Sequence, residues 1–130
     1  MFIDRCVSSL KNLVELFYEI RFWDNMNLDN IGDQTIANEM FDTGVNQGYK
    51  TAVKYFQEAL NLTNYYEDSN NVVVDGAVGP KTINAFKKHR RKSNVLKAMN
   101  ILQGMRYVKI CRENPIQEKF FNGWLNRVQV

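Results

Sequence analysis

The side chains of this sequence that could do acid–base chemistry are a small set of carboxylates in helix-forming stretches. The candidates are Glu15, Glu19, Glu39, Asp42 and Glu58. Two carboxyl groups flanking a sugar linkage can hydrolyse it, one as an acid and the other as a base or nucleophile. All of these residues except Asp42 are equally typical of the solvent-facing side of an amphipathic helix. The pattern alone therefore assigns none of them a catalytic role.

Metal and thiol chemistry have few side chains available. The chain has one histidine, His89, and two cysteines, Cys6 and Cys111. These are too few and too far apart for the usual tetrahedral zinc site. Because His89 lies within a basic run, we expect a neutral ring surrounded by solvent, and no cysteine–histidine nucleophile. We expect no metal and no cofactor, and the sequence leaves open whether Cys6 and Cys111 form a disulfide.

Charge is divided unevenly along the chain. Residues 1–80 carry five Lys/Arg against twelve Asp/Glu, a net −7, and residues 81–130 carry twelve against two, a net +10. Such polarity indicates either an anionic partner for the second part or two parts that attract each other. The densest basic run, 87–92, is typical of a helix end, where cations meet the negative end of the dipole. It would also suit nucleic acid, which we disfavour because no aromatic residue is interleaved for base stacking.

The elements that would position these side chains are mostly helices. Apolar residues recur at spacings of three and four, beginning with a helix over roughly 4–22. The β-branched run Val72–Val74 ends at an Asp-Gly turn. The sequence therefore predicts an all-α fold of about six helices, with one small β element near residues 72–75.

Four residues mark where helices should begin. Asp33 and Ser93 precede apolar periodic stretches and are good N-cap types. Pro80 and Pro115 suit the first helical turn, where the missing N–H has no intrahelical partner to lose.

Membrane and export signals are absent from the sequence as it stands. No stretch approaches the roughly 18 apolar residues that span a bilayer. The first six residues contain an acid where a signal peptide has bases. We expect no membrane span, and synthesis in the cytoplasm without a cleaved signal peptide.

Four segments, taken in order, resemble one family. They are Tyr18–Asp24, Met40–Gly48 with the helix that follows it, Val74–Thr82 and Phe120–Val128. Together they are similar to the lysozyme-like secretion activator proteins of phage or bacterial origin, glycoside hydrolase family 108. The last part of that family is described as a peptidoglycan-binding domain. The resemblance implies that residues 1–46 are a remnant of a lysozyme-like helical lobe and that residues 47–130 form a peptidoglycan-binding helical module.

The resemblance also has a departure that bears on activity. Family members begin with a Glu-Gly-Gly-aromatic helix, whose glutamate is taken as the acid of an N-acetylmuramidase, and no Glu-Gly pair occurs here. The resemblance implies that this segment is missing, so we expect a non-catalytic, peptidoglycan-associated chain. One alternative is an active muramidase that uses Glu15, Glu19 or Glu39. Another is a nucleic-acid or regulatory protein that acts through residues 87–92.

The same resemblance implies a substrate-binding set, which comprises Asp42, Asn46, Gly48, Trp23, Asp75 and Trp124. Asp42 and Asn46 lie four residues apart on one helix face, where they either bind sugar at a cleft edge or tie a helix junction. Asp75 is a ligand or a turn residue. Trp23 and Trp124 either stack on sugar rings or fill the core.

Partners and location follow from the same hypothesis. We expect peptidoglycan or another anionic wall polymer as partner, and action at the cell wall or in the periplasm. Without a catalytic lobe, the apolar stripe of the helix over 4–22 would have to cover a bare surface. We therefore expect a homodimer or a shifted first helix.

Overall fold

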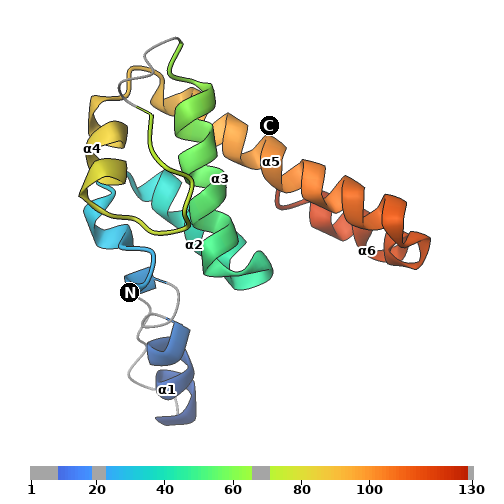
Figure 1. Cartoon of the computed structure of the whole chain (residues 1–130). Helices are drawn as coiled ribbons and strands as arrows, with labels where there is room; N and C mark the ends of the chain where they lie inside the picture. Colours follow the sequence, from blue (N-terminus) through green and yellow to red (C-terminus); the bar gives the residue numbers. More distant parts are fainter. Residues whose placement is uncertain (1–8, 19–22, 66–70, 129–130) are drawn as a thin grey trace.

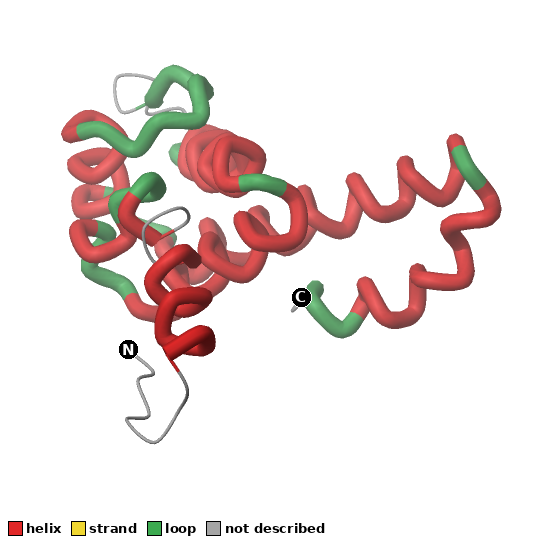
Figure 2. The backbone as a smooth tube through the Cα atoms, turned by 90° about the horizontal axis from the view of Figure 1, so that it is seen from below, coloured by secondary structure: helices red, strands yellow, loops and turns green. Residues whose placement is uncertain are grey.

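Six α-helices make up most of the described chain. The structure is a computed structural model, and it describes residues 9–18, 23–65 and 71–128. Figures 1 and 2 show α2, α3, α4 and the first part of α5 gathered together, with the rest of α5 extending away beside α6. The predicted all-α class with about six helices is confirmed. The elements are α1 (Ser9–Tyr18), η2 (Leu28–Asn30), α2 (Gln34–Gln47), α3 (Tyr49–Leu62), α4 (Pro80–Lys88), α5 (Lys92–Glu113), η4 (Pro115–Gln117) and α6 (Glu118–Leu125).

The predicted helix starts are mostly confirmed. Asp33 is the N-cap of α2 and accepts a hydrogen bond from the Ile36 backbone N–H at 3.1 Å. Pro80 begins α4, and Pro115 begins the short 3₁₀ turn that leads into α6. The prediction for Ser93 is wrong by two residues. The Arg91 carbonyl already accepts from the backbone N–H groups of the first turn of α5, so Arg91 is the cap.

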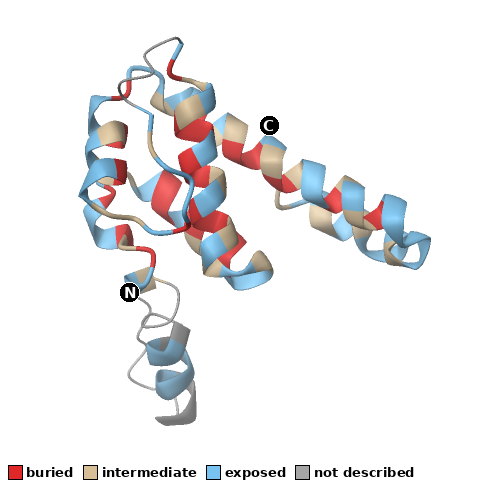
Figure 3. Cartoon of the chain, in the orientation of Figure 1, coloured by how far each residue is buried: buried red, intermediate tan, exposed pale blue. Residues whose placement is uncertain are grey.

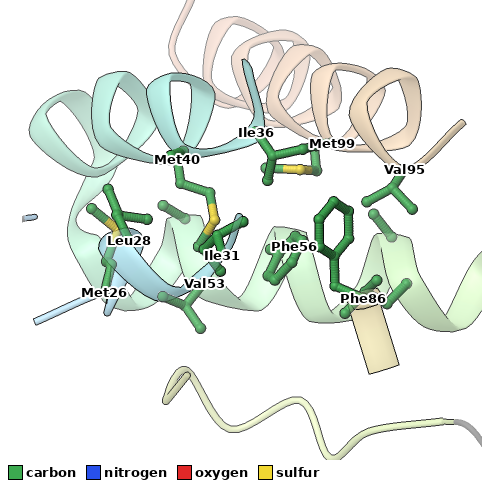
Figure 4. Packing of buried hydrophobic residues seen from close by; sticks show 14 residues of the cluster. Met26, Leu28, Ile31, Ile36, Met40, Val53, Phe56, Phe86, Val95 and Met99 are labelled. Atoms are coloured by element: carbon green, nitrogen blue, oxygen red, sulfur yellow. The ribbon is translucent and has the colours of Figure 1, made fainter. Parts of the chain in front are cut away.

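The core lies where α2, α3, α4 and the first turns of α5 meet, and the segment after Trp23 covers one side of it (Figures 3 and 4). Phe56 of α3 and Phe86 of α4 are almost fully buried, with ring centroids 5.5 Å apart. The cluster consists of Met26, Leu28, Ile31, Ile36, Ala37, Met40, Ala52, Val53, Phe56, Ala59, Leu60, Phe86, Val95 and Met99. The buried residues of α2 and α3 recur at spacings of three and four, so one face of each helix packs into the core.

A sharp junction joins α2 to α3. Gly48 has φ +95°, in the region that favours glycine, and its backbone N–H caps α2 by donating to the Gly44 carbonyl. A Cβ at Gly44 would lie 2.8 Å from the methyl carbon at the flexible end of Met26 and 3.5 Å from Tyr49 Cα, so this position packs closely against both. The two glycines therefore allow α2 and α3 to turn back on each other closely.

The buried amide of Gln57, on α3, organises the loop that follows Asn71. Its Oε1 accepts from the backbone N–H groups of Asp75 and Gly76, at 3.1 and 3.0 Å. Its Nε2 donates to Asp75 Oδ1, the Ala77 carbonyl and Thr82 Oγ1, at 3.0, 2.9 and 3.2 Å. One side chain thus holds the turn and the first part of α4 against α3.

The predicted β element near residues 72–75 is wrong: the structure has no strand in the described stretch 71–79. The backbone N–H and carbonyl of Val72 bind Asn61 Oδ1 and Nδ2, at 2.9 and 2.8 Å. Asn61 and Gln57 lie one turn apart on α3, so helix side chains take the place of a neighbouring strand. Val73 and Val74 remain exposed.

The second part of α5 forms a hairpin with α6. Tyr107 is 4% exposed and stacks on the Trp124 ring with centroids 5.0 Å apart. Trp124 also stacks on Phe120 at 5.9 Å. The hairpin therefore has an aromatic seam of its own, separate from the main cluster.

The predicted first helix is confirmed in part, and the predicted domain boundary is not tested by the structure. Of the helix predicted over 4–22, residues 9–18 form α1, and the ends of that range lie outside the described residues. The hydrophobic cluster includes residues on both sides of position 46, such as Met40 and Val53. The division into 1–46 and 47–130 stays a prediction.

Replacing Gln57 by Leu should destabilise the fold. The substitution leaves the Asp75 and Gly76 backbone N–H groups without their acceptor, and we expect a loss of about 2–4 kcal/mol in the free energy of unfolding, measured by urea denaturation. Glu58→Gln, at the exposed neighbouring position on α3, is the matched control and should change the same quantity by less than about 0.5 kcal/mol. A loss below about 1 kcal/mol in Gln57→Leu would contradict the role of this amide.

Candidate functional site

A hollow of about 750 Å³ opens between α3 and the second part of α5. Its apolar walls come from Tyr55, Met105 and Val108, and its charged groups are mostly cationic. Arg106, Lys109 and Arg112 follow one another at intervals of three, so they lie along one face of α5. The full lining is Tyr55, Met105, Arg106, Val108, Lys109, Arg112 and Glu113.

Tyr55 links three helices at the edge of this hollow. Its hydroxyl donates to Gln47 Oε1 of α2 at 2.9 Å, and it also has a side-chain hydrogen bond with Arg106 of α5. Burial raises the pKa of Tyr55, and the charge and hydrogen bond of Arg106 oppose that rise. The exposed side chain of Arg106 therefore lies beside Tyr55.

A smaller hollow of about 330 Å³ lies between α5 and α6. It shares Val108 and Arg112 with the first and is also lined by Cys111, Glu118, Phe121 and Asn122. Cys111 is buried and a free thiol. Cys6 lies outside the described residues, and Cys111 forms no disulfide in this structure.

Among the candidate carboxylates whose side chains the structure describes, Glu39 is the one that is buried. It is only 8% exposed, so the solvent-facing interpretation, one of the two left open for it, is wrong. Burial raises the pKa of Glu39, nearby Asp42 raises it further, and the hydrogen bond that the Thr43 hydroxyl donates at 3.3 Å lowers it. A carboxyl with a raised pKa is a feature of catalytic acids. Neither hollow, however, is lined by Glu39 or Asp42.

Asp42 and Asn46 make local and tertiary contacts on α2. Asn46 Nδ2 donates to the Asp42 carbonyl at 2.8 Å. Asp42 Oδ1 accepts from Arg127 Nη1 at 3.3 Å, in a pair whose side chains are 47% and 39% exposed. Arg127 follows α6, so Asp42 ties the chain after that helix to α2. A role of Asp42 and Asn46 in binding sugar stays a prediction.

Both tryptophans are half-buried and have protein partners. Trp23 Nε1 donates to Asp29 Oδ1 at 2.7 Å, and its ring lies 5.6 Å from that of Phe41. Trp124 belongs to the aromatic seam of the hairpin. A role of either ring in sugar stacking stays a prediction.

Asp75 and Gly48 both lie in turns of the backbone. Asp75 Oδ1 accepts from the Ala77 backbone N–H at 3.0 Å as well as from Gln57. These two bonds lower the pKa of Asp75. Gly48 lies at the junction of α2 and α3. The structure therefore connects Asp42 with Asn46, and the hydrogen bonds of Asp75 lead instead to α3 and to its own loop.

The basic run 87–92 forms the corner between α4 and α5. His89 is 7% exposed, so the expectation that solvent surrounds it is wrong. Its Nδ1 accepts from the Arg91 backbone N–H at 2.9 Å, and its Nε2 lies 2.8 Å from Thr63 Oγ1. Since Thr63 Oγ1 donates to the Ala59 carbonyl at 2.7 Å, these contacts assign the neutral tautomer with the proton on Nε2.

One lysine and one arginine of that corner also have internal partners. Lys92 Nζ donates to the Lys87 and His89 carbonyls at 3.1 and 2.8 Å. The Arg91 guanidinium lies 5.2 Å from the centroid of the Tyr65 ring. Lys92 therefore binds carbonyls at the end of α4 and Arg91 lies against an aromatic ring. Whether the run also binds an anion stays a prediction.

The cationic residues around the larger hollow were missed by the sequence reasoning. Arg106, Lys109 and Arg112 are spread over two helical turns and form no dense run. Their spacing of three was the available signal, but the facing residue, Tyr55, lies about fifty positions earlier in the chain. Among the described residues, no cluster could hold a metal ion, and no helix is long and apolar enough to cross a membrane.

A family model described as a predicted peptidoglycan domain matches residues 51–129, so the chain belongs to this peptidoglycan domain family. A second model, glycosyl hydrolase 108, matches residues 5–48. The resemblance drawn from the sequence motifs is confirmed. No curated protein matches the chain significantly.

The pKa of Glu39 makes stability depend on pH in a specific direction. Because the folded state holds this proton more tightly than the unfolded state, Glu39 should reduce stability as pH rises from the ordinary value of 4.5 through the raised folded-state value. Glu39→Gln removes that penalty, so the free energy of unfolding of the variant relative to wild type should increase between about pH 4 and about pH 7.

Urea denaturation at several pH values measures this trend. Glu58→Gln removes an exposed carboxylate of α3 and is the control, for which we expect no comparable trend. If the relative stability of Glu39→Gln does not change with pH, or falls as pH rises, the assignment of a raised pKa is wrong.

Proposed function

We propose that this chain binds peptidoglycan without cutting it. A peptidoglycan-associated function is supported by the match of residues 51–129 to the peptidoglycan domain family, and this match is the observation that carries the proposal. The matched range contains α3, α4, α5 and α6, and hence every residue that lines the two hollows. The segment 47–130 would act as the binding module, at the cell wall or in the periplasm.

The non-catalytic part of the proposal depends on where the carboxylates lie. Glu39 and Asp42 line neither hollow, and Asp42 is paired with Arg127. Glu113 lines the larger hollow, but its side chain is 67% exposed and lies 4.0 Å from Lys109. A general acid needs a shielded position beside the bond it protonates. Glu113 is not shielded, and Glu39, which is shielded, lines neither of the two hollows.

Retention on purified peptidoglycan tests the binding proposal. We expect the chain to sediment with insoluble peptidoglycan at low salt, and to be released in part as salt rises, since cationic side chains contribute to the contact. Cellulose particles offered at equal mass are the control for non-specific adsorption to a polysaccharide. Equal retention on both, or no retention on peptidoglycan at low salt, would contradict the proposal.

A second candidate function, N-acetylmuramidase activity, is favoured by one observation, the burial and raised pKa of Glu39. A wall-clearing assay separates the two functions, and we expect no clearing by wild type or by Glu39→Gln. Clearing by wild type that is lost in Glu39→Gln would instead support the muramidase. The side chains of Glu15 and Glu19 lie outside the described residues, so the same assay on Glu15→Gln and Glu19→Gln completes the test.

We also propose that the chain forms a homodimer through contacts made by α1. Leu13, Val14 and Leu16 are between 46% and 62% exposed on this one helix. Apolar side chains gathered on a surface helix are typical of an interaction surface. Nucleic acid remains a disfavoured partner, and no observation on residues 87–92 supports it.

Replacing Leu13 and Leu16 together by Asp should shift the chain from dimer to monomer, because two charges would have to be buried in the contact. Sedimentation velocity at equal protein concentration measures the shift. Asn12→Asp adds a charge at an exposed polar position of the same helix and should leave the dimer intact. A wild-type chain that sediments as a monomer would contradict the dimer.

A further inference from the structure

The hollow between α3 and α5 combines features that select a particular kind of ligand. It holds two guanidinium groups and one ammonium group over walls contributed by Tyr55, Met105 and Val108. Guanidinium groups form paired hydrogen bonds with planar carboxylates, and apolar walls favour ligands that carry methyl or methylene groups. Its volume of about 750 Å³ is within the range of pockets that hold small organic ligands.

We propose that this hollow binds the peptide stems of peptidoglycan through their free carboxylates. This inference rests on the proposed function, since it names which part of the polymer the chain contacts. Stem peptides are short chains of small amino acids that carry free carboxylates, which matches both the cations and the apolar walls. The glycan strand offers hydroxyl groups and no such charge, and a polyol phosphate would leave the apolar walls without a partner.

Arg106 is one of the two arginines that line the hollow, and it contacts Tyr55. The Tyr55 hydroxyl contacts its guanidinium and is itself fixed by donating to Gln47 Oε1 at 2.9 Å. Lys109 lies 4.0 Å from Glu113 in an exposed pair, so that carboxylate weakens the positive potential of the hollow. Arg106 and Arg112 should therefore contribute more than Lys109.

Titration calorimetry with a synthetic stem tetrapeptide tests the inference directly. The same peptide with every carboxyl amidated, a chitotetraose and a glycerol phosphate polymer are the comparison ligands. We expect the free tetrapeptide to bind at least about tenfold more tightly than the amidated one, as loss of a charge-assisted contact predicts. We expect no measurable binding of the chitotetraose.

Variants of α5 connect that binding to the hollow. Arg106→Gln and Arg112→Gln should each weaken tetrapeptide binding by roughly tenfold, and Glu113→Gln should strengthen it, because it removes the one anion from the lining. Lys97→Gln removes an exposed cation of the same helix outside the hollow and is the matched control. Thermal unfolding of each variant shows that it is folded before binding is measured.

The outcomes separate this inference from the proposed function. Retention on intact peptidoglycan together with equal affinity for the free and amidated tetrapeptides would overturn the carboxylate inference and leave the proposed function standing. Tighter binding of the glycerol phosphate polymer would overturn it in favour of a phosphate ligand. Unchanged affinity in both arginine variants would overturn the assignment of the peptide site to this hollow. Failure to be retained on peptidoglycan at all would contradict the proposed function itself.

Discussion

The hydrogen bonds of Gln57 determine how the second half of the chain joins the first. A loop that crosses a helix without a neighbouring strand must find other partners for its buried backbone groups. Gln57 supplies one acceptor for the N–H groups of Asp75 and Gly76, and its N–H groups also reach Thr82 near the start of α4. Once α4 begins at that place, Phe86 lies against Phe56 and completes the core (Figure 4). The hydrogen bonds of a single amide thereby position α4 so that Phe86 packs into the apolar cluster.

The helices could be predicted from the sequence because helical periodicity is a local signal, carried by residues three and four apart. The behaviour of Val72–Val74 could not, because β-branched residues report a preference for extended backbone and say nothing about what will pair with it. The partner here is Asn61, one helical turn from Gln57, and both amides are ordinary helix-surface types in a sequence. His89 was misjudged for a related reason: its neighbours are basic, but Thr63, which buries it, lies twenty-six residues away.

The candidate site shows the same division between local and tertiary information. Motifs such as Asp42 with Asn46, or Asp75 with Gly76, were recognisable because their residues are close in sequence, and the structure gives them structural partners. The cationic hollow needs Tyr55 from α3 opposite Arg106 from α5, a pairing that no local pattern predicts. Glu39 illustrates the limit within one helix. Its spacing suits a solvent-facing position, and only the packing around α2 reveals that it is buried.

In the folded chain, the densest run of basic residues is not the group of cations that lines a hollow. Its densest basic run, 87–92, is engaged at a helix corner, where Lys92 donates to backbone carbonyls and Arg91 lies against Tyr65. Arg127 is paired with Asp42, so part of the attraction between the acidic and basic halves is internal. The cations that line a hollow are instead spaced along the outer part of α5. The electrostatic potential at a ligand depends on which charges face the space that the ligand occupies. An anionic polymer would therefore be attracted to the hollow between α3 and α5. The number of basic residues in the corner at 87–92 does not measure that attraction.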